Sequence, residues 1–268
     1  MASAREPDED EIRASLEDEI GSSADRRGRW YAEYLGLEYR HAVDAALSRA
    51  GGAAPRVLKT DLWNECVAGD RDIANHLAES VGCRLFAVEL SLALCVRGRD
   101  RAPGAAVVRA DIRALPFRTG SFDAVLDLST LDHLSEEGAA RAVGEYERVL
   151  RPAGALLLVY WQRGALLRLR LLLKRWLGRP ERSGQRYFRP GDVRDWVEKG
   201  AAAAWEVPVG SLLLPPHRLT RAVLGRIPAG ACTAILRATV SVERWRFARR
   251  LLAPITGMRA VLAVRNPS

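Results

Sequence analysis

Short apolar runs alternate with stretches of helical periodicity along the middle of the chain. The runs of strand length are residues 56–62, 85–90, 105–111, 122–129 and 155–161. Helices are expected near 71–80, 91–99 and 136–150, the last capped by Ser135 and followed by a turn at Arg151–Gly154. This alternation predicts βαβ units, and therefore a parallel sheet with helices on both faces.

Further patterns flank this core. Apolar and aromatic positions recur at helical spacing from residue 29 to 50, where Gly51 and Gly52 end the predicted N-terminal helix. After residue 161, a helix is expected at 192–199 and strands at 205–214 and 259–265. The predicted total is a mostly parallel sheet of seven strands.

Charge sets the first residues apart from the rest. Residues 1–25 hold nine acidic and two basic residues and therefore carry a net charge of −7. Because the whole chain has a net charge of +8, the remaining residues carry +15. Dense charge with few apolar residues predicts a flexible arm, with a short helix near 12–20. Residues 26–268 are expected to form one domain, because an α/β domain of this size is ordinary.

Three parts are expected within this domain: a core at 55–162, a basic helical insertion at 163–200 and C-terminal strands at 201–268. Ten basic residues lie between Arg163 and Arg194, and leucines recur near Trp176. A basic amphipathic helix with a tryptophan can lie on an anionic membrane, and a lid whose leucines cover a pocket is the alternative. The basic excess itself has two interpretations, a genomic bias toward arginine and an anionic partner such as lipid or nucleic acid.

Cysteine spacing and the lengths of the apolar runs bear on location. The four cysteines are far apart and form no CxxC pair, so neither a disulfide framework nor a metal site is predicted. No signal-peptide pattern begins the chain, and no run of about 18 apolar residues is free of charge. We therefore expect a cytoplasmic protein, with peripheral attachment to a membrane as the alternative.

Acidic residues follow four of the predicted strands, at the edge where an open parallel sheet binds ligands. The polar residues after these strands are Thr60, Asp61, Glu65, Glu89, Asp111 and Asp127. Glu89 is suited to accept hydrogen bonds from both ribose hydroxyls of a nucleotide, or to cap the next helix. Asp111 is suited to accept a hydrogen bond from the amino group of an adenine, with Ile112 packing against the ring. A turn residue is the alternative role of Asp111.

The stretch from Ala110 to Val125, ADIRALPFRTGSFDAV, resembles the Asp-x-x-x-Leu-Pro-Phe and Ser-Phe-Asp-x-Val pattern of class I S-adenosylmethionine-dependent methyltransferases that act on small molecules and lipids. The segment Glu147–Gly154 is similar to that family's helix-Leu-Arg-Pro-Gly-Gly lead into the fifth strand. The resemblance covers about residues 55–162. It implies a Rossmann-like, doubly wound α/β fold and methyl transfer to a small or lipophilic substrate. It also implies S-adenosyl-L-methionine as cofactor, held by Thr60, Asp61, Glu65, Glu89, Asp111, Ile112 and Asp127.

The loop after the first strand departs from the family pattern. The family carries Asp-x-Gly-x-Gly-x-Gly there, whereas residues 59–65 read KTDLWNE and no glycine precedes Gly69. Glycines let the backbone approach the methionyl part of the cofactor. Either the loop binds the cofactor in a rearranged way, with Asp61 or Glu65 facing the sulfonium or the amino group, or the domain is a catalytically silent binding or scaffold module.

Asp132 and His133 are the candidates for acid–base chemistry. They follow the fourth strand, where the family lines its pocket, so His133 with Asp132 is suited to take a proton from the acceptor. A helix cap is the alternative role of the pair. Methylation of nucleic acid is the least favoured activity, because the chain has no Asn-Pro-Pro-Tyr or Asp-Pro-Pro-Tyr motif for a flipped base.

Overall fold

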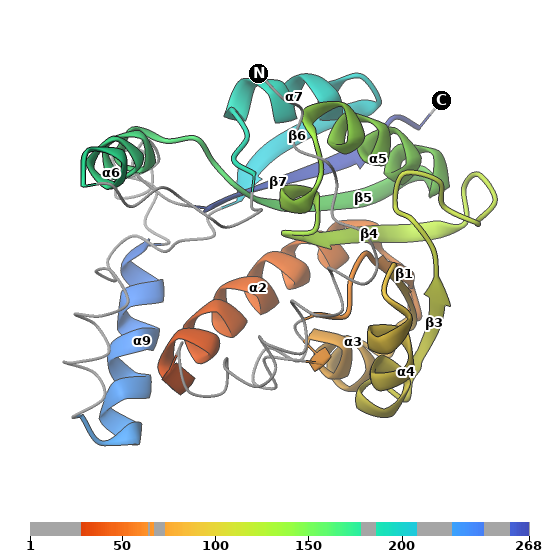
Figure 1. Cartoon of the computed structure of the whole chain (residues 1–268). Coiled ribbons are helices and arrows are strands. Elements are labelled where there is room, and N and C mark those ends of the chain that lie inside the picture. Colours follow the sequence, from red (N-terminus) through yellow and green to blue (C-terminus); the bar gives the residue numbers. More distant parts are fainter. Residues whose placement is uncertain are drawn as a thin grey trace.

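One sheet of seven strands organises the computed structural model, which describes residues 28–63, 65–66, 73–177, 186–207, 227–243 and 258–267. The strands are β1 (Arg56–Lys59), β2 (Arg84–Glu89), β3 (Ala105–Arg109), β4 (Phe122–Leu128), β5 (Leu150–Trp161), β6 (Ala201–Val207) and β7 (Met258–Arg265). Their order is β3-β2-β1-β4-β5-β7-β6 (Figure 1). Strands β1 to β5 pair in parallel, and β7 runs antiparallel to its neighbours β5 and β6. The predicted mostly parallel sheet is confirmed.

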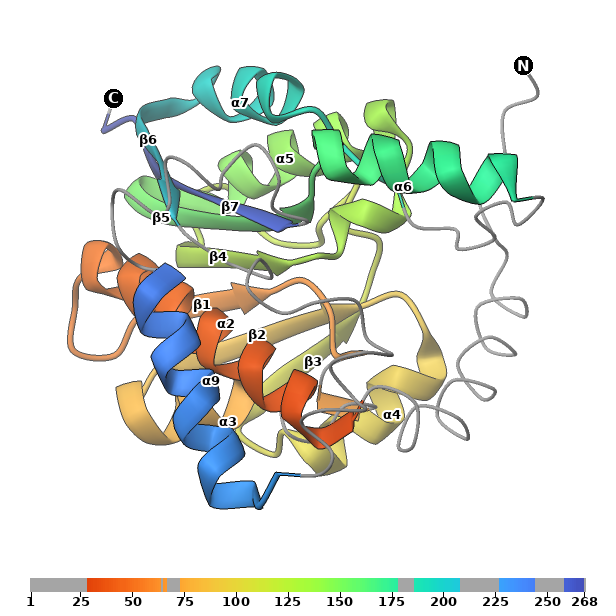
Figure 2. The same ribbon diagram turned by 90° about the vertical axis from the view of Figure 1, so that its left-hand side faces the viewer.

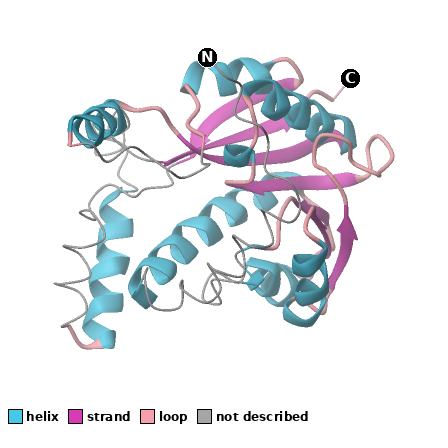
Figure 3. Cartoon of the chain, viewed as in Figure 1, coloured by secondary structure: helices cyan, strands magenta, loops and turns pink. Residues whose placement is uncertain are grey.

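Helices cover both faces of the sheet, as predicted (Figure 3). The helices α2 (Gly28–Ala50), α3 (Ile73–Val81) and α4 (Leu92–Arg101) lie on one face. The other face carries α5 (Glu136–Val149) and α7 (Pro190–Glu198). Successive strand residues point to opposite faces, so Val57 packs in the core beneath α2 while Leu58 packs in the core beneath α5. Burial on both faces explains why these strands read as continuous apolar runs.

Strand β5 begins earlier than expected. The predicted turn at Arg151–Gly154 lies inside the strand, where the register with β4 shifts between Phe122 and Ala124. Ala153 has a φ of 61°, and a Cβ at Gly154 would lie 2.9 Å from the Arg151 carbonyl oxygen. The residues predicted as a turn therefore form an irregular start of β5, because residues 151–154 lie within the register shift as a bulge.

Strand β6 spans residues 201–207, earlier than the predicted 205–214, of which 208–214 lie outside the described residues. Helix α9 (Ala229–Glu243), which was not predicted, packs along α2 (Figure 2). Helix α6 (Ala165–Trp176) follows β5 within the predicted insertion. The acidic arm at 1–25 and its helix near 12–20 also lie outside the described residues. Among the described helices, none has the length and apolar character needed to cross a membrane.

Candidate functional site

Lys59 ends β1 with a side chain that is fully buried at the carboxyl edge of the sheet. Its Nζ donates to the Asp61 carbonyl oxygen at 2.6 Å and pairs with Glu65 Oε2 at 3.0 Å. Burial alone lowers the pKa of Lys59, but the charges of Asp61 and Glu65 outweigh burial and raise it above its usual value. Lys59 is therefore charged, and it holds the loop after β1 from within.

The same loop is tied to the end of β4. Asp61 Oδ1 accepts from the Trp63 amide at 3.0 Å, and Asp61 Oδ2 accepts from Thr130 Oγ1 at 2.9 Å. Thr60 Oγ1 shares a 2.8 Å hydrogen bond with the same Thr130 hydroxyl. Sequence reasoning did not single out Thr130, because its partners lie about seventy positions away along the chain.

Leu62 packs against α4. It lies in the loop that is glycine-rich in the class I methyltransferases that the sequence resembles. It is buried in a cluster with Cys66 and Leu94, and Trp63 packs against this cluster. A Cβ at Gly98 of α4 would lie 2.4 Å from Leu62 Cδ1. The loop without glycines is thus accommodated because a glycine on the neighbouring helix leaves room for its leucine.

Glu89 ends β2 with 8% of its surface exposed. Its Oε2 accepts from the Leu62 amide at 3.1 Å, and its Oε1 accepts from the Ser91 amide at 2.9 Å. Burial raises the pKa of Glu89 to about 7, against the opposing effect of these two amides. Ser91 rather than Glu89 caps α4, because its side chain accepts from the Leu94 amide. Each carboxylate oxygen keeps a second lone pair, which a hydroxyl donor can use.

Asp127 supports the turn that follows β4. Its Oδ1 accepts from the Thr130 amide at 2.8 Å, and its Oδ2 accepts from the Tyr146 hydroxyl at 2.7 Å. Burial raises its pKa to about 6, although both hydrogen bonds oppose that shift. Asp127 thereby fixes the position of Thr130, and through it that of Asp61.

Asp132 is buried, whereas His133 is exposed. Asp132 Oδ1 accepts from the Trp161 amide at 2.9 Å, and its Oδ2 is bonded to the Ser129 hydroxyl. Burial raises the pKa of Asp132 well above its usual value. Both Asp132 oxygens therefore hold neighbouring residues in place, and proton transfer by His133 stays a prediction.

Asp111 lies after β3, where Arg113 binds it through a fork of hydrogen bonds. Arg113 Nε donates to both carboxylate oxygens, at 3.0 and 2.9 Å, and Nη2 donates to Oδ2 at 2.7 Å. Burial alone would raise the pKa of Asp111, but Arg113 outweighs burial and lowers it. Ile112 is buried in the core beneath α5. The contact of Asp111 and Ile112 with an adenine stays a prediction.

The two motif stretches of the sequence contact each other. Arg148 Nη1 donates to the Phe117 carbonyl oxygen at 2.7 Å, and Arg148 Nη2 donates to the Leu115 carbonyl oxygen at 2.9 Å. The Leu115 amide in turn donates to Glu145 Oε2 at 2.7 Å. The Phe117 ring packs edge-to-face on Phe122, with centroids 4.9 Å apart. Helix α5 therefore holds the Leu-Pro-Phe loop between β3 and β4.

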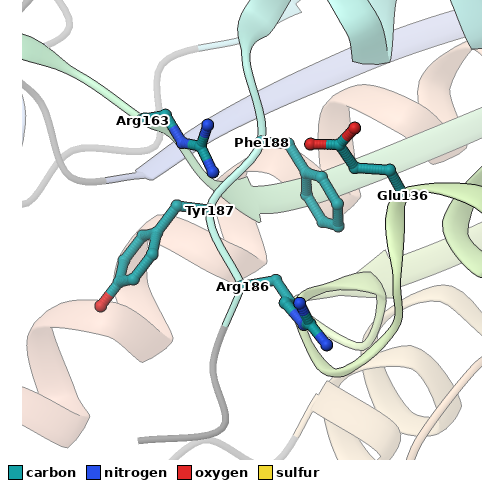
Figure 4. Close-up of a pocket in the computed structure, with 5 residues that line it drawn as sticks. All are labelled: Glu136, Arg163, Arg186, Tyr187 and Phe188. Atoms are coloured by element: carbon teal, nitrogen blue, oxygen red, sulfur yellow. The ribbon is translucent and has the colours of Figure 1, made fainter. Parts of the chain in front are cut away.

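A pocket of about 250 Å³ opens near the carboxyl end of β5 (Figure 4). Its lining residues are Glu136, Arg163, Arg186, Tyr187 and Phe188. The Arg186 amide donates to the Asp132 carbonyl oxygen at 2.6 Å, and the Arg163 amide donates to the Phe188 carbonyl oxygen at 2.8 Å. The pocket is therefore anchored on the turn that carries Asp132 and His133. No local sequence pattern predicted this pocket, since its lining residues come from separate segments.

The strand-end residues fit S-adenosylmethionine in charge and in the type of group they offer. That cofactor carries a sulfonium, an ammonium and a carboxylate group, and its net charge is positive. Asp61, Glu65 and Glu89 outnumber the single cation Lys59 at the described ends of β1 and β2, which favours a cationic ligand. Asp61 keeps 13% of its side chain exposed. Glu89 lies where a carboxylate binds the ribose in nucleotide-binding βαβ folds.

Comparison with known proteins finds similarity to methyltransferases in the middle of the chain. Residues 65–158 match the family model described as a methyltransferase domain. A protein of Encephalitozoon cuniculi named as a methyltransferase is 33% identical over 46% of this chain and 59% of its own length. A demethylmenaquinone methyltransferase of Beutenbergia cavernae is 33% identical over 46% and 47% of the two chains. A protein of Bos taurus named as tRNA methyltransferase 9B is 31% identical over 36% and 20%. The chain thus spans less than two thirds of each of these relatives.

A solved structure shares the fold. The complex between the Haloferax volcanii Trm112 methyltransferase activator and a methyltransferase is similar with a TM-score of 0.56 and 15% identity, covering 96% of this chain and 97% of that one. An identity this low shows the fold alone. The match over residues 65–158 confirms the resemblance to class I S-adenosylmethionine-dependent methyltransferases for that part of the chain, and the shared fold agrees with it.

Proposed function

We propose that this protein binds S-adenosylmethionine at the carboxyl ends of β1 and β2 and transfers its methyl group to a small or lipophilic acceptor. The observation that carries the proposal is the Glu89 carboxylate. It ends β2, is held by the amides of Leu62 and Ser91, and keeps lone pairs for the two ribose hydroxyls. The match of residues 65–158 to a methyltransferase domain supplies the expectation of methyl transfer.

The residues of the chain have separate tasks in this proposal. Glu89 binds the ribose, Asp61 offsets the charge of the amino acid end while Glu65 balances Lys59, and Ile112 with Asp111 contacts the adenine. Bound cofactor supplies an electrophilic methyl group, and the chain's residues bring an acceptor into line with it. His133, on the turn beside the pocket, takes a proton from acceptors that must lose one.

Calorimetric titration with S-adenosylhomocysteine tests the binding half of this proposal. We expect measurable affinity for the wild type, and at least tenfold weaker affinity for Glu89→Ala, because the ribose loses its acceptor. Glu198→Ala, an exposed acid on α7, is the matched control and leaves the affinity unchanged. Unchanged affinity in Glu89→Ala would discard the ribose assignment.

A catalytically silent binding module is the second candidate, and Lys59 is the observation that favours it. A fully buried cation occupies the strand end where the family carries an acid. In this alternative the ion pairs of Lys59 stabilise a loop that has no ligand to bind. Absence of heat on titrating the wild type with S-adenosylhomocysteine would support the silent module and reject the enzyme.

The acceptor side of the proposal rests on the pocket at Arg163 and Arg186. A volume of about 250 Å³ suits a small molecule or the head of a lipophilic one. One relative is named as a tRNA methyltransferase, so RNA is the alternative acceptor. Radiolabelled S-adenosylmethionine, offered with a lipid extract, a small-molecule extract or bulk tRNA, separates these classes. Label in the tRNA fraction alone would overturn the proposed acceptor.

A further inference from the structure

Helix α6 and the residue after it carry most of the exposed large apolar side chains found among the described residues. Five of these nine side chains lie on this short segment. They are Leu169 (54% exposed), Leu172 (65%), Leu173 (49%), Trp176 (82%) and Leu177 (61%). Clusters of exposed apolar side chains of this kind mark surfaces that bind a partner or a membrane.

The five side chains share one face of α6. At 100° per residue, positions 169, 172, 173, 176 and 177 fall within an arc of about 140°. Leu167 and Leu171, which are only partly exposed, fall on the opposite side of the helix. The leucines of α6 therefore do not all point into the protein, as a lid over a pocket would require.

Basic residues accompany this apolar face in the sequence of α6. By the same helical spacing, the exposed Arg168 falls just outside the apolar arc, and the sequence from 165 to 177 holds four basic residues in all. The sequence from 165 to 177 contains no acidic residue. An apolar face on a basic helix, with a tryptophan in it, is the arrangement that suits the boundary between lipid headgroups and acyl chains.

Within the described part of the chain, the position of α6 leaves room for such a surface. In Figures 1 and 2 this helix lies outside the layers formed by the sheet and the other described helices. It begins two residues after Arg163, which lines the pocket. A membrane against the outer face of α6 would therefore meet the protein on the side where the pocket begins.

We infer that α6 docks this protein on the surface of an anionic lipid bilayer, lying in the plane of the membrane rather than crossing it. Leu169, Leu172, Leu173 and Trp176 enter the headgroup boundary, while the basic residues of the helix contact lipid phosphates. The charge complementarity favours anionic lipid over an apolar protein surface. This inference stands independently of methyl transfer, because it uses none of the strand-end residues.

Co-sedimentation of the full chain with vesicles tests the inference. We expect binding to vesicles of phosphatidylcholine with 30% phosphatidylglycerol at low salt, and at least tenfold weaker partitioning into pure phosphatidylcholine. Binding should also weaken as salt is raised, because the lipid surface potential is screened. In anionic vesicles, fluorescence of the wild type minus that of Trp176→Phe should shift to the blue and be quenched by brominated lipid.

Two paired variants locate the contact. Leu172→Gln/Leu173→Gln should lose at least tenfold in partitioning, whereas Leu92→Gln/Val96→Gln, which removes comparably exposed apolar side chains from α4, should bind as the wild type does. Circular dichroism and melting temperature verify that both variants are folded. The inference fails if the wild type does not bind anionic vesicles, or if both pairs bind equally. It also fails if Leu172→Gln/Leu173→Gln converts a wild-type dimer into a monomer without changing lipid binding, because a second copy would then cover this face.

Discussion

Lys59 stands at the most unusual position of the site, because a buried lysine requires partners that offset its lost hydration. Glu65 and the Asp61 carbonyl oxygen supply them, at 3.0 and 2.6 Å. The lysine thus cross-links the loop in place of the tight glycine turns of the family. Its positive charge is balanced locally, so the acid of Glu89 stays available at the neighbouring strand end.

Removing this cation should destabilise the fold strongly. We expect Lys59→Met to lower the free energy of unfolding by about 3–5 kcal/mol, because Glu65 is left charged and buried without its partner. Lys59→Met/Glu65→Leu should recover most of that loss, since an apolar pair needs no compensation. Urea denaturation measures both effects.

The exposed pair Arg194 and Glu198 on α7 is the control for this cycle. Arg194→Met/Glu198→Leu should change the free energy of unfolding by no more than about 1 kcal/mol. A Lys59→Met protein as stable as the wild type would show that the buried pair does not hold the loop.

Glu89 should make stability depend on pH. Its pKa in the folded protein is about 7, above its usual 4.5, so folding favours the protonated form. The stability that Glu89 contributes is therefore fully present below pH 4.5 and is lost as the pH rises through about 7. Because Glu89→Gln cannot titrate, the wild type should lose stability relative to this variant between these two values.

Denaturation of both proteins at pH 5, 6, 7 and 8 measures this difference. The comparison cancels the other titrating groups, including Asp127, whose pKa is also raised. A difference that stays constant from pH 5 to 8 would mean that Glu89 does not titrate in this range.

At the residue scale, sequence reasoning found the strand-end acids but not their partners. Glu89 and Asp127 were predictable because each ends a continuous apolar run. Thr130 and Tyr146 were not, because their contacts with Asp61 and Asp127 join segments far apart in the sequence. Asp132 was predicted beside a catalytic His133, and its hydrogen bonds instead position Ser129 and Trp161. Local patterns identify the element that a residue ends, whereas such contacts arise only on folding.

The packing of the loop after β1 against α4 is an interaction between elements, and it depends on a single glycine. We expect Gly98→Ala to lower the free energy of unfolding by about 1–3 kcal/mol, because its Cβ would overlap Leu62 in a closely packed cluster. Gly144→Ala is the matched control on α5, where a Cβ would meet nothing within 4 Å. That variant should raise stability by up to about 1 kcal/mol, as alanine favours a helix. Equal melting temperatures for the two variants would contradict the packing described here.

Elements with a strong pattern were predicted well, and those without one were missed. Ser91 and Ser135 cap α4 and α5, as their side chains bond the Leu94 and Gly138 amides. Helix α9 has the sequence AGACTAILRATVSVE, in which apolar and small residues are mixed without a charged face. Its place along α2 is a tertiary contact that periodicity does not encode.

At the scale of the whole molecule, the order of the strands brings the site together. β1 lies between β2 and β4, so the loop after β1 is bonded on one side to Glu89 and on the other to Thr130. The alternation of strands and helices was enough to predict this sheet and the edge at which the strand-end acids gather. The position of α6 beyond the sheet was not predictable, because the sequence of a basic, leucine-rich helix is compatible with a lid and with a membrane-surface helix.

A crystal structure of the protein with saturating S-adenosylhomocysteine tests most directly whether a strand end without loop glycines binds the cofactor. We predict ligand density at the carboxyl ends of β1 and β2, with the ribose hydroxyls within hydrogen-bonding distance of the Glu89 carboxylate and the Lys59–Glu65 pair intact. Density elsewhere on the protein, or none at saturating ligand, would contradict the proposed site.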